Sequence, residues 1–279
     1  MATNRKKNWK EAIVEAAQEV IDTLGVEGYG ERNYEKALLH EFRLRDIPYD
    51  SQRHIEITYK GYSLGLRRPD IIVSPAWSKS PGNEYPVEVK VWKTELTKQA
   101  LNQLRMYLSA MNLQKGLLLN FNTRTAMIDS EEIKSDKKYP VQSPVYRVGK
   151  SRKVLRSLRD AASIVFKEFG TSFFYYQGGL DFYTKAIKVE LLLKGFVTHE
   201  RKYPITYKNQ QITVHTYDYV FSSGDVVKVI SDKSDKLGEK LKKQKNKLSK
   251  MNKQFHIQNG YIIAIPEDDD EGRVIIEKV

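Results

Sequence analysis

The fold of this chain is decided by two short stretches, Pro69-Asp70-Ile71-Ile72-Val73-Ser74 and Val87-Glu88-Val89-Lys90-Val91-Trp92. Both are apolar runs of strand length, and we interpret each as a β-strand. Because successive side chains of a strand point to opposite faces, Glu88 and Lys90 share one face while the valines around them point into the core. The second strand therefore presents a carboxylate and an ammonium group side by side.

Helices and further strands flank these two stretches in a regular order. The spacing of apolar residues predicts helices over residues 9–24 and 31–45, followed by a strand at 55–59 that ends in the turn Lys60-Gly61. An amphipathic helix near 100–111 and a buried, parallel strand at 116–121 come after Trp92. The order is αβββαβ, which predicts an α/β fold.

A carboxylate on the second helix joins the polar pair. Glu31 lies three residues before Tyr34 and seven before Leu38, so it falls on the stripe that faces the core. A charge there is costly unless a cation neutralises it. Carboxylate oxygens suit Mg²⁺ or Mn²⁺, which polarise a phosphate and activate water. A neighbouring lysine can orient that water, so the set suits phosphodiester hydrolysis.

The residues around these positions resemble a known family. Gly28-Tyr29-Gly30-Glu31-Arg32-Asn33-Tyr34 spells G-x-x-E-x-x-Y, and matching residues continue in order at Glu35-Lys36-Ala37-Leu38, Glu41, Ile47-Pro48, Tyr59-Lys60-Gly61, Pro69-Asp70, Glu88-Val89-Lys90, Gln103, Tyr107-Leu108 and Leu117-Leu118-Leu119-Asn120-Phe121. Over about residues 10–122 the chain is similar to the GxxExxY family of the PD-(D/E)XK nuclease superfamily.

This resemblance implies a restriction-endonuclease-like core, a mixed sheet flanked by helices. It also implies roles for five residues: Asp70 and Glu88 as metal ligands, Lys90 as the catalytic lysine, Glu31 as an auxiliary carboxylate of the metal site, and Gln103 as a contact to the site or the scissile phosphate. The chain departs from the family in the loop at 75–86, which is longer than the expected hairpin. Its Trp77 and Lys79 are open to two interpretations, a substrate contact or an inert insertion.

The pattern then returns in the second half of the chain. Five segments match in the same order: Tyr34-Glu35-Lys36-Ala37-Leu38 with Tyr183-Thr184-Lys185-Ala186-Ile187, Ile57-Thr58-Tyr59-Lys60 with Ile205-Thr206-Tyr207-Lys208, Asp70-Ile71-Ile72-Val73-Ser74 with Asp218-Tyr219-Val220-Phe221-Ser222, Leu108-Ser109-Ala110-Met111-Asn112 with Leu248-Ser249-Lys250-Met251-Asn252, and Gly116-Leu117-Leu118-Leu119 with Gly260-Tyr261-Ile262-Ile263. We therefore predict tandem PD-(D/E)XK-like domains over 1–133 and 151–279, joined by a linker at 134–150.

The second copy lacks part of the polar set. Asp218 aligns with Asp70 and Lys228 with Lys90, but Val226 takes the place of Glu88 and Leu180 that of Glu31. Asp225 is adjacent, yet strand alternation points it to the opposite face. We interpret this copy as a non-catalytic pseudo-nuclease retained for stability, dimerisation or nucleic-acid binding.

The formal net charge of +12 predicts a polyanionic partner, because lysines on phosphates release condensed counterions. We expect nucleic acid, DNA ahead of RNA. The residues expected to bind it are Lys236, Lys240, Lys242, Lys243, Lys245, Lys247 and Lys250, with Arg152, Lys153 and Arg156. The aromatic run Phe173-Phe174-Tyr175-Tyr176 could stack on bases, but core or interface packing is favoured.

Composition excludes several other classes. The chain has no cysteine, so disulfides and zinc-thiolate sites are excluded. No apolar run is long enough for a membrane span, and no apolar stretch follows the basic start, so we expect an intracellular protein with no membrane partner.

Two functions compete, a Mg²⁺- or Mn²⁺-dependent nuclease and a non-catalytic nucleic-acid-binding or packaging protein on the same fold. A protein-interaction module is a third. A homodimer is expected if both strands of a duplex are cut.

Overall fold

The structure is a computed structural model, and it describes residues 8–26, 28–51, 53–74, 83–94, 96–135, 154–171, 173–174, 178–269 and 272–279. The chain divides into two compact units. Unit 1 comprises Met1–Thr58 and Gly65–Tyr139, and unit 2 comprises Tyr59–Leu64 and Pro140–Val279. Four sequence interpretations lie outside the described residues: the loop with Trp77 and Lys79, nearly all of the linker at 134–150, Arg152 with Lys153, and Tyr175 with Tyr176.

A five-stranded sheet forms the centre of unit 1. Its order is β1-β4-β5-β6-β7, made by Tyr49–Asp50, Ile71–Val73, Tyr85–Lys90, Lys115–Asn122 and Met127–Lys134. The pairs β1–β4, β4–β5 and β6–β7 are antiparallel, whereas β5 and β6 are parallel. The predictions of a mixed sheet and of a parallel strand at 116–121 are thus confirmed. The sequence did not predict β1 and β7.

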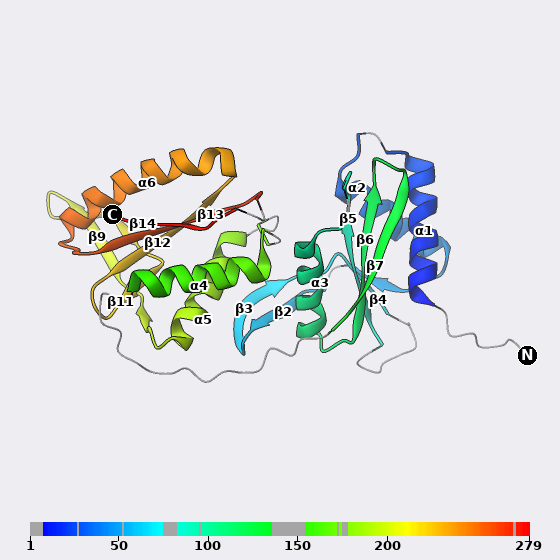
Figure 1. The fold of residues 1–279 in the computed structure, drawn as a ribbon, viewed down its shortest axis with the longest axis horizontal. Helices are drawn as coiled ribbons and strands as arrows, with labels where there is room; N and C mark the ends of the chain where they lie inside the picture. Colours follow the sequence, from blue (N-terminus) through cyan, green and yellow to red (C-terminus); the bar gives the residue numbers. More distant parts are fainter. Residues whose placement is uncertain are drawn as a thin grey trace, which may run out of the picture. The chain divides into compact units, whose positions relative to one another are not determined.

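Helices cover both faces of the unit 1 sheet, with α1 and α3 on opposite sides (Figure 1). α1 (Trp9–Leu24) and α2 (Glu31–Leu44) pack against Val87, Val89 and Leu117. α3 (Lys98–Ala110) packs against Leu118 on the other face. The alternation along β5 therefore turns its valines to α1 and α2 and leaves Glu88 and Lys90 on the face of α3.

A two-stranded ribbon, β2 (Ile55–Tyr59) and β3 (Tyr62–Arg67), is joined by the predicted turn. Lys60 and Gly61 both have positive φ, at 50° and 86°. Two consecutive positive φ values are what a type I′ hairpin turn requires, and glycine adopts the second at no steric cost.

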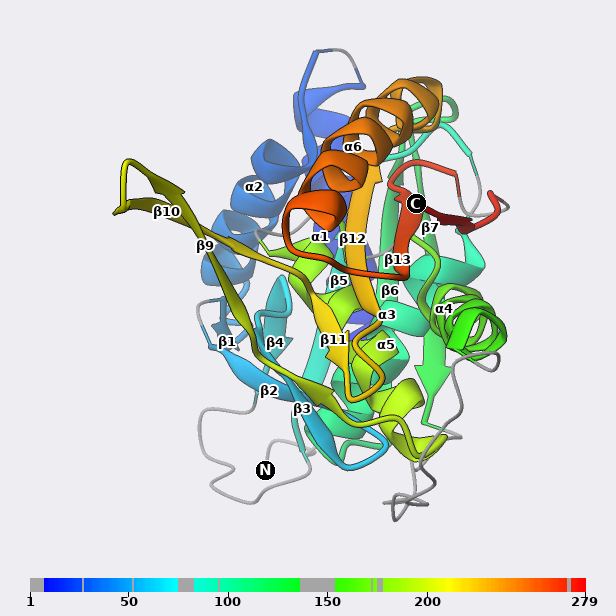
Figure 2. The same cartoon turned by 90° about the vertical axis from the view of Figure 1, so that its left-hand side faces the viewer.

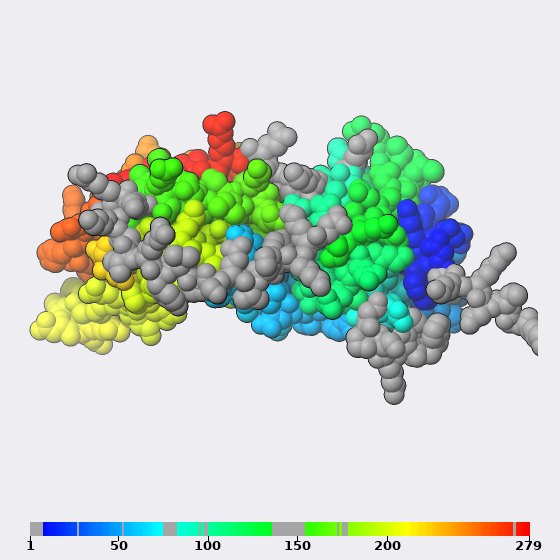
Figure 3. All heavy atoms as spheres, turned by 60° about the horizontal axis from the view of Figure 1, so that its bottom comes forward, coloured from blue at the N-terminus to red at the C-terminus, as the bar shows by residue number. Residues whose placement is uncertain are grey.

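Unit 2 has the same element order. α4 (Val154–Phe169) and α5 (Gly179–Leu193) precede a ribbon of β9 (Lys202–Tyr207) and β10 (Gln210–Thr216), whose side chains are mostly exposed (Figure 3). The sheet order is β8-β11-β12-β13-β14, made by Thr198–His199, Tyr219–Phe221, Val226–Asp232, Gly260–Pro266 and Ile275–Lys278. Its central pair, β12–β13, is parallel and its other pairs are antiparallel, as in unit 1. α6 (Ser234–Gln254) covers one face and α4 and α5 the other (Figure 1).

Each unit fixes its helical pair with the same hydrogen bond. The Tyr34 hydroxyl donates to the Gly25 carbonyl at 2.7 Å, and the Tyr183 hydroxyl donates to the Gly170 carbonyl at 2.6 Å. Both glycines follow the end of the preceding helix and have positive φ, 74° and 53°. A buried tyrosine thus ties the second helix to the loop after the first.

Removing the Tyr34 or the Tyr183 hydroxyl tests how much these hydrogen bonds stabilise the protein. Tyr34→Phe and Tyr183→Phe are each expected to lower the free energy of unfolding by about 1–2 kcal/mol, because a buried carbonyl loses its donor. The measurement is urea unfolding followed by circular dichroism. Tyr207→Phe, at a site 64% exposed, is the control and should change little. Equal effects at all three positions would contradict a stabilising role for the two tyrosine-to-glycine hydrogen bonds.

One sequence match is wrong by a helical turn. The predicted repeat pairs Asn112 with Asn252, but the helix ends pair Asn112 with His256. Both residues have φ 53° directly after the helix C-cap, and the next residue donates back into the last turn, Leu113 to Leu108 and Ile257 to Asn252.

The aromatic run packs into the core where it is described. The Phe173 ring stacks on Phe182 at 4.1 Å and the Phe174 ring on Tyr183 at 4.2 Å. Phe173 is therefore a core residue, and Phe174 packs on Tyr183 in a half-buried position.

No helix within the described ranges is long and apolar enough to cross a lipid bilayer.

Candidate active site

Glu88 lies at the centre of the polar set on β5 and is fully buried. Its Oε1 atom accepts a hydrogen bond from Lys90 Nζ at 2.6 Å and another from Gln103 Nε2, also at 2.6 Å. Lys90 is two residues further along the same strand, and Gln103 reaches the carboxylate from α3. The predicted face-sharing of Glu88 and Lys90 is therefore observed as a direct contact.

Asp70 and Glu31 complete the set from two other elements. Asp70 precedes β4, and its Oδ2 atom accepts a hydrogen bond from the Val89 backbone N–H at 2.8 Å. Glu31 is the first residue of α2, and its Oε2 atom is 4.0 Å from Lys90 Nζ. The structure thus brings together all five residues that the sequence singled out for catalysis.

The local electrostatics favour a cation at this place. Burial and the nearby Asp70 carboxylate raise the pKa of Glu88 to about 8, although Lys90 opposes the shift. Burial lowers the pKa of Lys90, but Glu88, Asp70 and Glu31 together raise it by more. Burial also raises the pKa of Glu31 against the effect of Lys90. Three carboxylates around one ammonium group leave excess negative charge, which a proton or a metal cation can neutralise.

A further carboxylate, Glu35, belongs to this neighbourhood and was not singled out from the sequence. Burial and the charges of Asp70 and Glu31 raise its pKa, while Arg68 lowers it. Glu35 lies one helical turn after Glu31, on the same face of α2. The spacing of four residues between Glu31 and Glu35 is the sequence feature that would have singled out Glu35.

Asn120 positions the chain that leaves the site. It pairs with Lys90 across the parallel β5–β6 ladder. Its Oδ1 atom accepts from the Trp92 N–H at 2.8 Å, and its Nδ2 atom donates to the Thr94 carbonyl at 3.2 Å and to Asp129 Oδ2 at 3.1 Å. A buried amide therefore fixes the segment directly after Lys90, a positioning role that the apolar pattern of β6 did not reveal.

The carboxylates of this cluster are the kind of oxygen ligand that a hard divalent cation uses. Among the described residues, no three carboxylate, imidazole or thiol groups form a ready-made metal site. Glu88 faces Lys90 and Gln103, and Asp70 faces the Val89 N–H. Such a cation in a phosphate-processing site commonly uses only one or two carboxylates, and water and phosphate oxygens complete its coordination.

The corresponding position in unit 2 is altered, and the strand register corrects the sequence alignment. Ile71 pairs with Val87, and Tyr219 pairs with Val227, so Glu88 corresponds to Lys228 rather than Val226. The aspartates agree with this register: Asp218 Oδ2 accepts from the Val229 N–H at 2.6 Å, as Asp70 does from Val89. Lys90 therefore corresponds to Ile230, not to Lys228.

Lys228 replaces a carboxylate with an ammonium group. Its Nζ atom is 3.1 Å from Asp218 Oδ1, so the aspartate is neutralised within unit 2. Asp225 is buried away from this pair and accepts hydrogen bonds from Ser223 and Asn259. By strand register, unit 2 therefore has Asp218 at the place of Asp70, Lys228 at the place of Glu88 and Ile230 at the place of Lys90.

The predicted nucleic-acid-binding lysines all lie exposed on α6, and Arg156 lies exposed on α4. Lys240 pairs with Asp232 at 3.2 Å, and Lys245 pairs with Glu277 at 2.8 Å.

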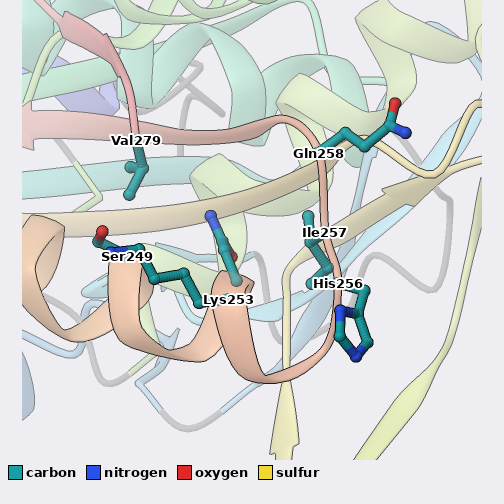
Figure 4. A pocket seen from close by; sticks show the side chains of 7 residues that line it. Ser249, Lys253, His256, Ile257, Gln258 and Val279 are labelled. Carbon is teal, nitrogen blue, oxygen red and sulfur yellow. The ribbon is translucent and has the colours of Figure 1, made fainter.

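A shallow hollow of about 480 Å³ opens at the end of α6 (Figure 4). Its lining includes Ser249, Lys253, His256 and Val279 but no carboxylate side chain. It contains none of the predicted catalytic residues, so the residues around Glu88, and not this hollow, form the candidate active site.

Comparison with known proteins gives a family match over the first part of the chain. No curated protein matches the chain. The crystal structure of SSO0001 is similar over 48% of this chain and 71% of that chain, with 16% identity and a TM-score of 0.26, too low to carry an argument. Residues 7–133, which hold all five predicted catalytic residues, match the family model of the PD-(D/E)XK nuclease superfamily and so indicate a nuclease-like fold.

Proposed function

We propose that the protein is a divalent-metal-dependent nuclease that hydrolyses phosphodiester bonds. Its proposed active site contains Asp70, Glu88 and Lys90. The observation that carries the proposal is the contact of Lys90 Nζ with Glu88 Oε1 at 2.6 Å, with Glu31 at 4.0 Å, inside the region that matches the nuclease family model. A carboxylate cluster with one buried lysine is a donor set for phosphoryl chemistry. DNA is the proposed polymer, and the G-x-x-E-x-x-Y stretch supports the GxxExxY branch of the superfamily.

Each residue has a distinct part in this proposal. Asp70 and Glu88 would hold Mg²⁺ or Mn²⁺, with Glu31 as an auxiliary carboxylate. When bound, the cation polarises the phosphate and lowers the pKa of a water molecule. Lys90 orients the attacking water and stabilises charge on the phosphate. Gln103 donates to Glu88 Oε1 and so keeps the carboxylate in place.

A cleavage assay tests the proposal. We expect the wild-type protein to cut DNA with Mg²⁺ or Mn²⁺, and EDTA and Asp70→Ala each to abolish cutting. Asp218→Ala is the matched control, because Asp218 makes the same backbone contact in unit 2. It should leave cleavage within about threefold of wild type, a change of under 1 kcal/mol in the barrier. Cleavage that survives Asp70→Ala would refute the site.

We further propose that unit 2 is a degenerate second copy of unit 1. The shared strand order, the paired tyrosine-to-glycine hydrogen bonds and the paired aspartate contacts all support a duplication. Nuclease chemistry then belongs to unit 1 alone. Cutting both strands of a duplex would require a homodimer, because each chain supplies one site.

One observation favours a non-catalytic alternative. Glu88 already receives hydrogen bonds from Lys90 and Gln103, so its charge is partly compensated inside the protein. A nucleic-acid-binding or packaging protein would show tight, salt-sensitive binding and no cleavage in either wild type or Asp70→Ala. Negligible binding to DNA and RNA at low salt would instead indicate a protein-interaction module.

A further inference from the structure

The lysines of α6 are sorted onto two flanks of the helix. α6 carries eight lysines and two acidic residues, and its buried side is formed by Leu237, Leu241, Leu248, Met251 and Asn252. At about 100° per residue, one flank holds the exposed series Lys236, Lys240, Lys243, Lys247 and Lys250, which we call the lysine stripe. The spacing alternates between four and three residues, which keeps the lysine stripe straight. Lys242, Lys245 and Lys253 lie on the other flank.

The lysine stripe runs past the place where unit 2 lost its acidic site. The equivalence of Asn112 and His256 at the helix ends puts Lys247 at the position of Gln103. The strand register puts Lys228 at the position of Glu88. α6 packs on β12, the strand that carries Lys228 (Figure 2). A carboxylate and an amide in unit 1 are thus replaced by two ammonium groups in unit 2.

The charges of Lys228 and Lys247 both affect the pKa of His215 on β10. Burial lowers the pKa of His215, and Lys228 and Lys247 lower it further, while Asp218 raises it. Both lysines therefore act on one imidazole from two different elements. The acidic groups nearby are Asp218, paired with Lys228, and Asp232, paired with Lys240. α6 also carries Asp235 and Glu239 near its start but no acidic residue after Glu239, so Lys243, Lys247 and Lys250 lie on a part of the helix whose charged residues are all basic.

We propose that the lysine stripe, together with Lys228, is a metal-independent track for the phosphate backbone of a nucleic acid. The inference deepens the proposed function and rests on it for the identity of the polymer. From Lys236 to Lys250 the helix rises about 21 Å, at about 1.5 Å per residue. One strand of a duplex places phosphates about 3.4 Å apart along its axis, so the track spans about six of them.

The shape of the track favours nucleic acid over a lipid surface. A helix that binds membranes inserts an apolar face among the acyl chains. The apolar face of α6 is buried against its own sheet, in a cluster with Ile262 and Ala264. A straight row of cations with no exposed apolar neighbour on the helix matches a linear polyanion.

Salt-dependent binding compares two variants that lose the same amount of charge at different places on unit 2. Both are made in full-length Asp70→Ala protein with EDTA, so cleavage plays no part. The stripe variant is Lys243→Gln/Lys247→Gln/Lys250→Gln, and the control is Lys188→Gln/Lys202→Gln/Lys208→Gln, three exposed lysines that are not on α6. Fluorescence anisotropy follows a labelled DNA duplex of about 20 base pairs, two helical turns, at a series of NaCl concentrations.

We expect the stripe variant to flatten the slope of log K against log salt by about 2–3, since each lost phosphate contact contributes about 0.9. At 0.1 M salt this corresponds to about 10²-fold weaker binding. The control should change the slope by less than about 1, and Lys228→Gln alone should reduce it by about 1. Equal losses in both triple variants, no loss in either, or stripe-dependent binding to phosphatidylserine vesicles without DNA binding would each overturn the inference. A protein that binds in this way but never cleaves would refute the nuclease and leave the track intact.

Discussion

Glu88→Gln is expected to stabilise unit 1 and at the same time to remove most of the proposed metal-dependent cleavage. The folded-state pKa of Glu88 is raised to about 8, above its ordinary value of 4.5. A carboxylate with a raised pKa weakens the fold as pH rises from about 4.5 to about 8, because the unfolded chain ionises more easily. At pH 7 an uncharged glutamine avoids this cost. We expect the free energy of unfolding to rise by about 1–2 kcal/mol.

The same change removes a ligand oxygen and its charge. We expect DNA cleavage to fall by about 10²–10³-fold, the effect of losing one preorganised electrostatic contact. Urea unfolding at pH 7 with EDTA measures the stability, and the cleavage assay measures the activity. Glu41→Gln is the control, because Glu41 forms an ordinary ion pair with Arg45 at 2.6 Å. A Glu88→Gln protein that unfolds at lower urea than wild type would contradict the electrostatic argument.

Lys90→Met is expected to destabilise the protein by about 3–5 kcal/mol, because it removes the buried ammonium group that compensates the carboxylates around it. Lys90 is 9% exposed, and Glu88, Asp70 and Glu31 all raise its pKa, so it is charged in the folded state. Methionine would leave these carboxylates without their cation. The methionine side chain is nearly as long as that of lysine, so the packing around position 90 changes little.

A double-mutant cycle separates charge from packing. Glu88→Gln/Lys90→Met removes both partners of the 2.6 Å contact and should recover part of the stability lost in Lys90→Met alone, since Asp70 and Glu31 remain. The measurement is again urea unfolding at pH 7. Additive effects of the two substitutions would mean that the pair does not act as an electrostatic unit.

The sequence predicted the elements that carry strong apolar periodicity. The helix at 9–24 and the parallel strand near 116–121 are observed as α1 and β6. β1 was missed because a two-residue strand has no period to detect. β7 was missed because it carries Asp129, Glu131 and Glu132, and half-exposed charged strands lack an apolar alternation.

The two wrong alignments have one physical origin. A strand shifted by two residues keeps every side chain on its face, so alternation could not distinguish Lys228 at the position of Lys90 from Lys228 at the position of Glu88. A helix shifted by four residues nearly keeps its face, which hid the one-turn error at Asn252. Only hydrogen-bonded partners, such as Val229 with Asp218, distinguish these registers.

The candidate site was more predictable than its surroundings. Glu88 and Lys90 were linked by strand period alone, and both lie where that period puts them. Glu35 and Asn120 were not identified, because their importance depends on neighbours that are distant in sequence. Asn120 contacts Trp92 and Thr94, which no local pattern connects to β6.

The turn of the β2–β3 ribbon has a consequence for any attempt to subclone the two halves. Tyr59–Leu64 belongs to unit 2, where the Tyr59 hydroxyl donates to the buried Glu190 carboxylate at 2.6 Å and its ring meets Phe169 at 5.3 Å. No single cut in the polypeptide therefore releases two complete globules. A recombinant fragment that starts at residue 140 lacks part of its own interior, and the complementary fragment carries a tyrosine whose partners have been removed.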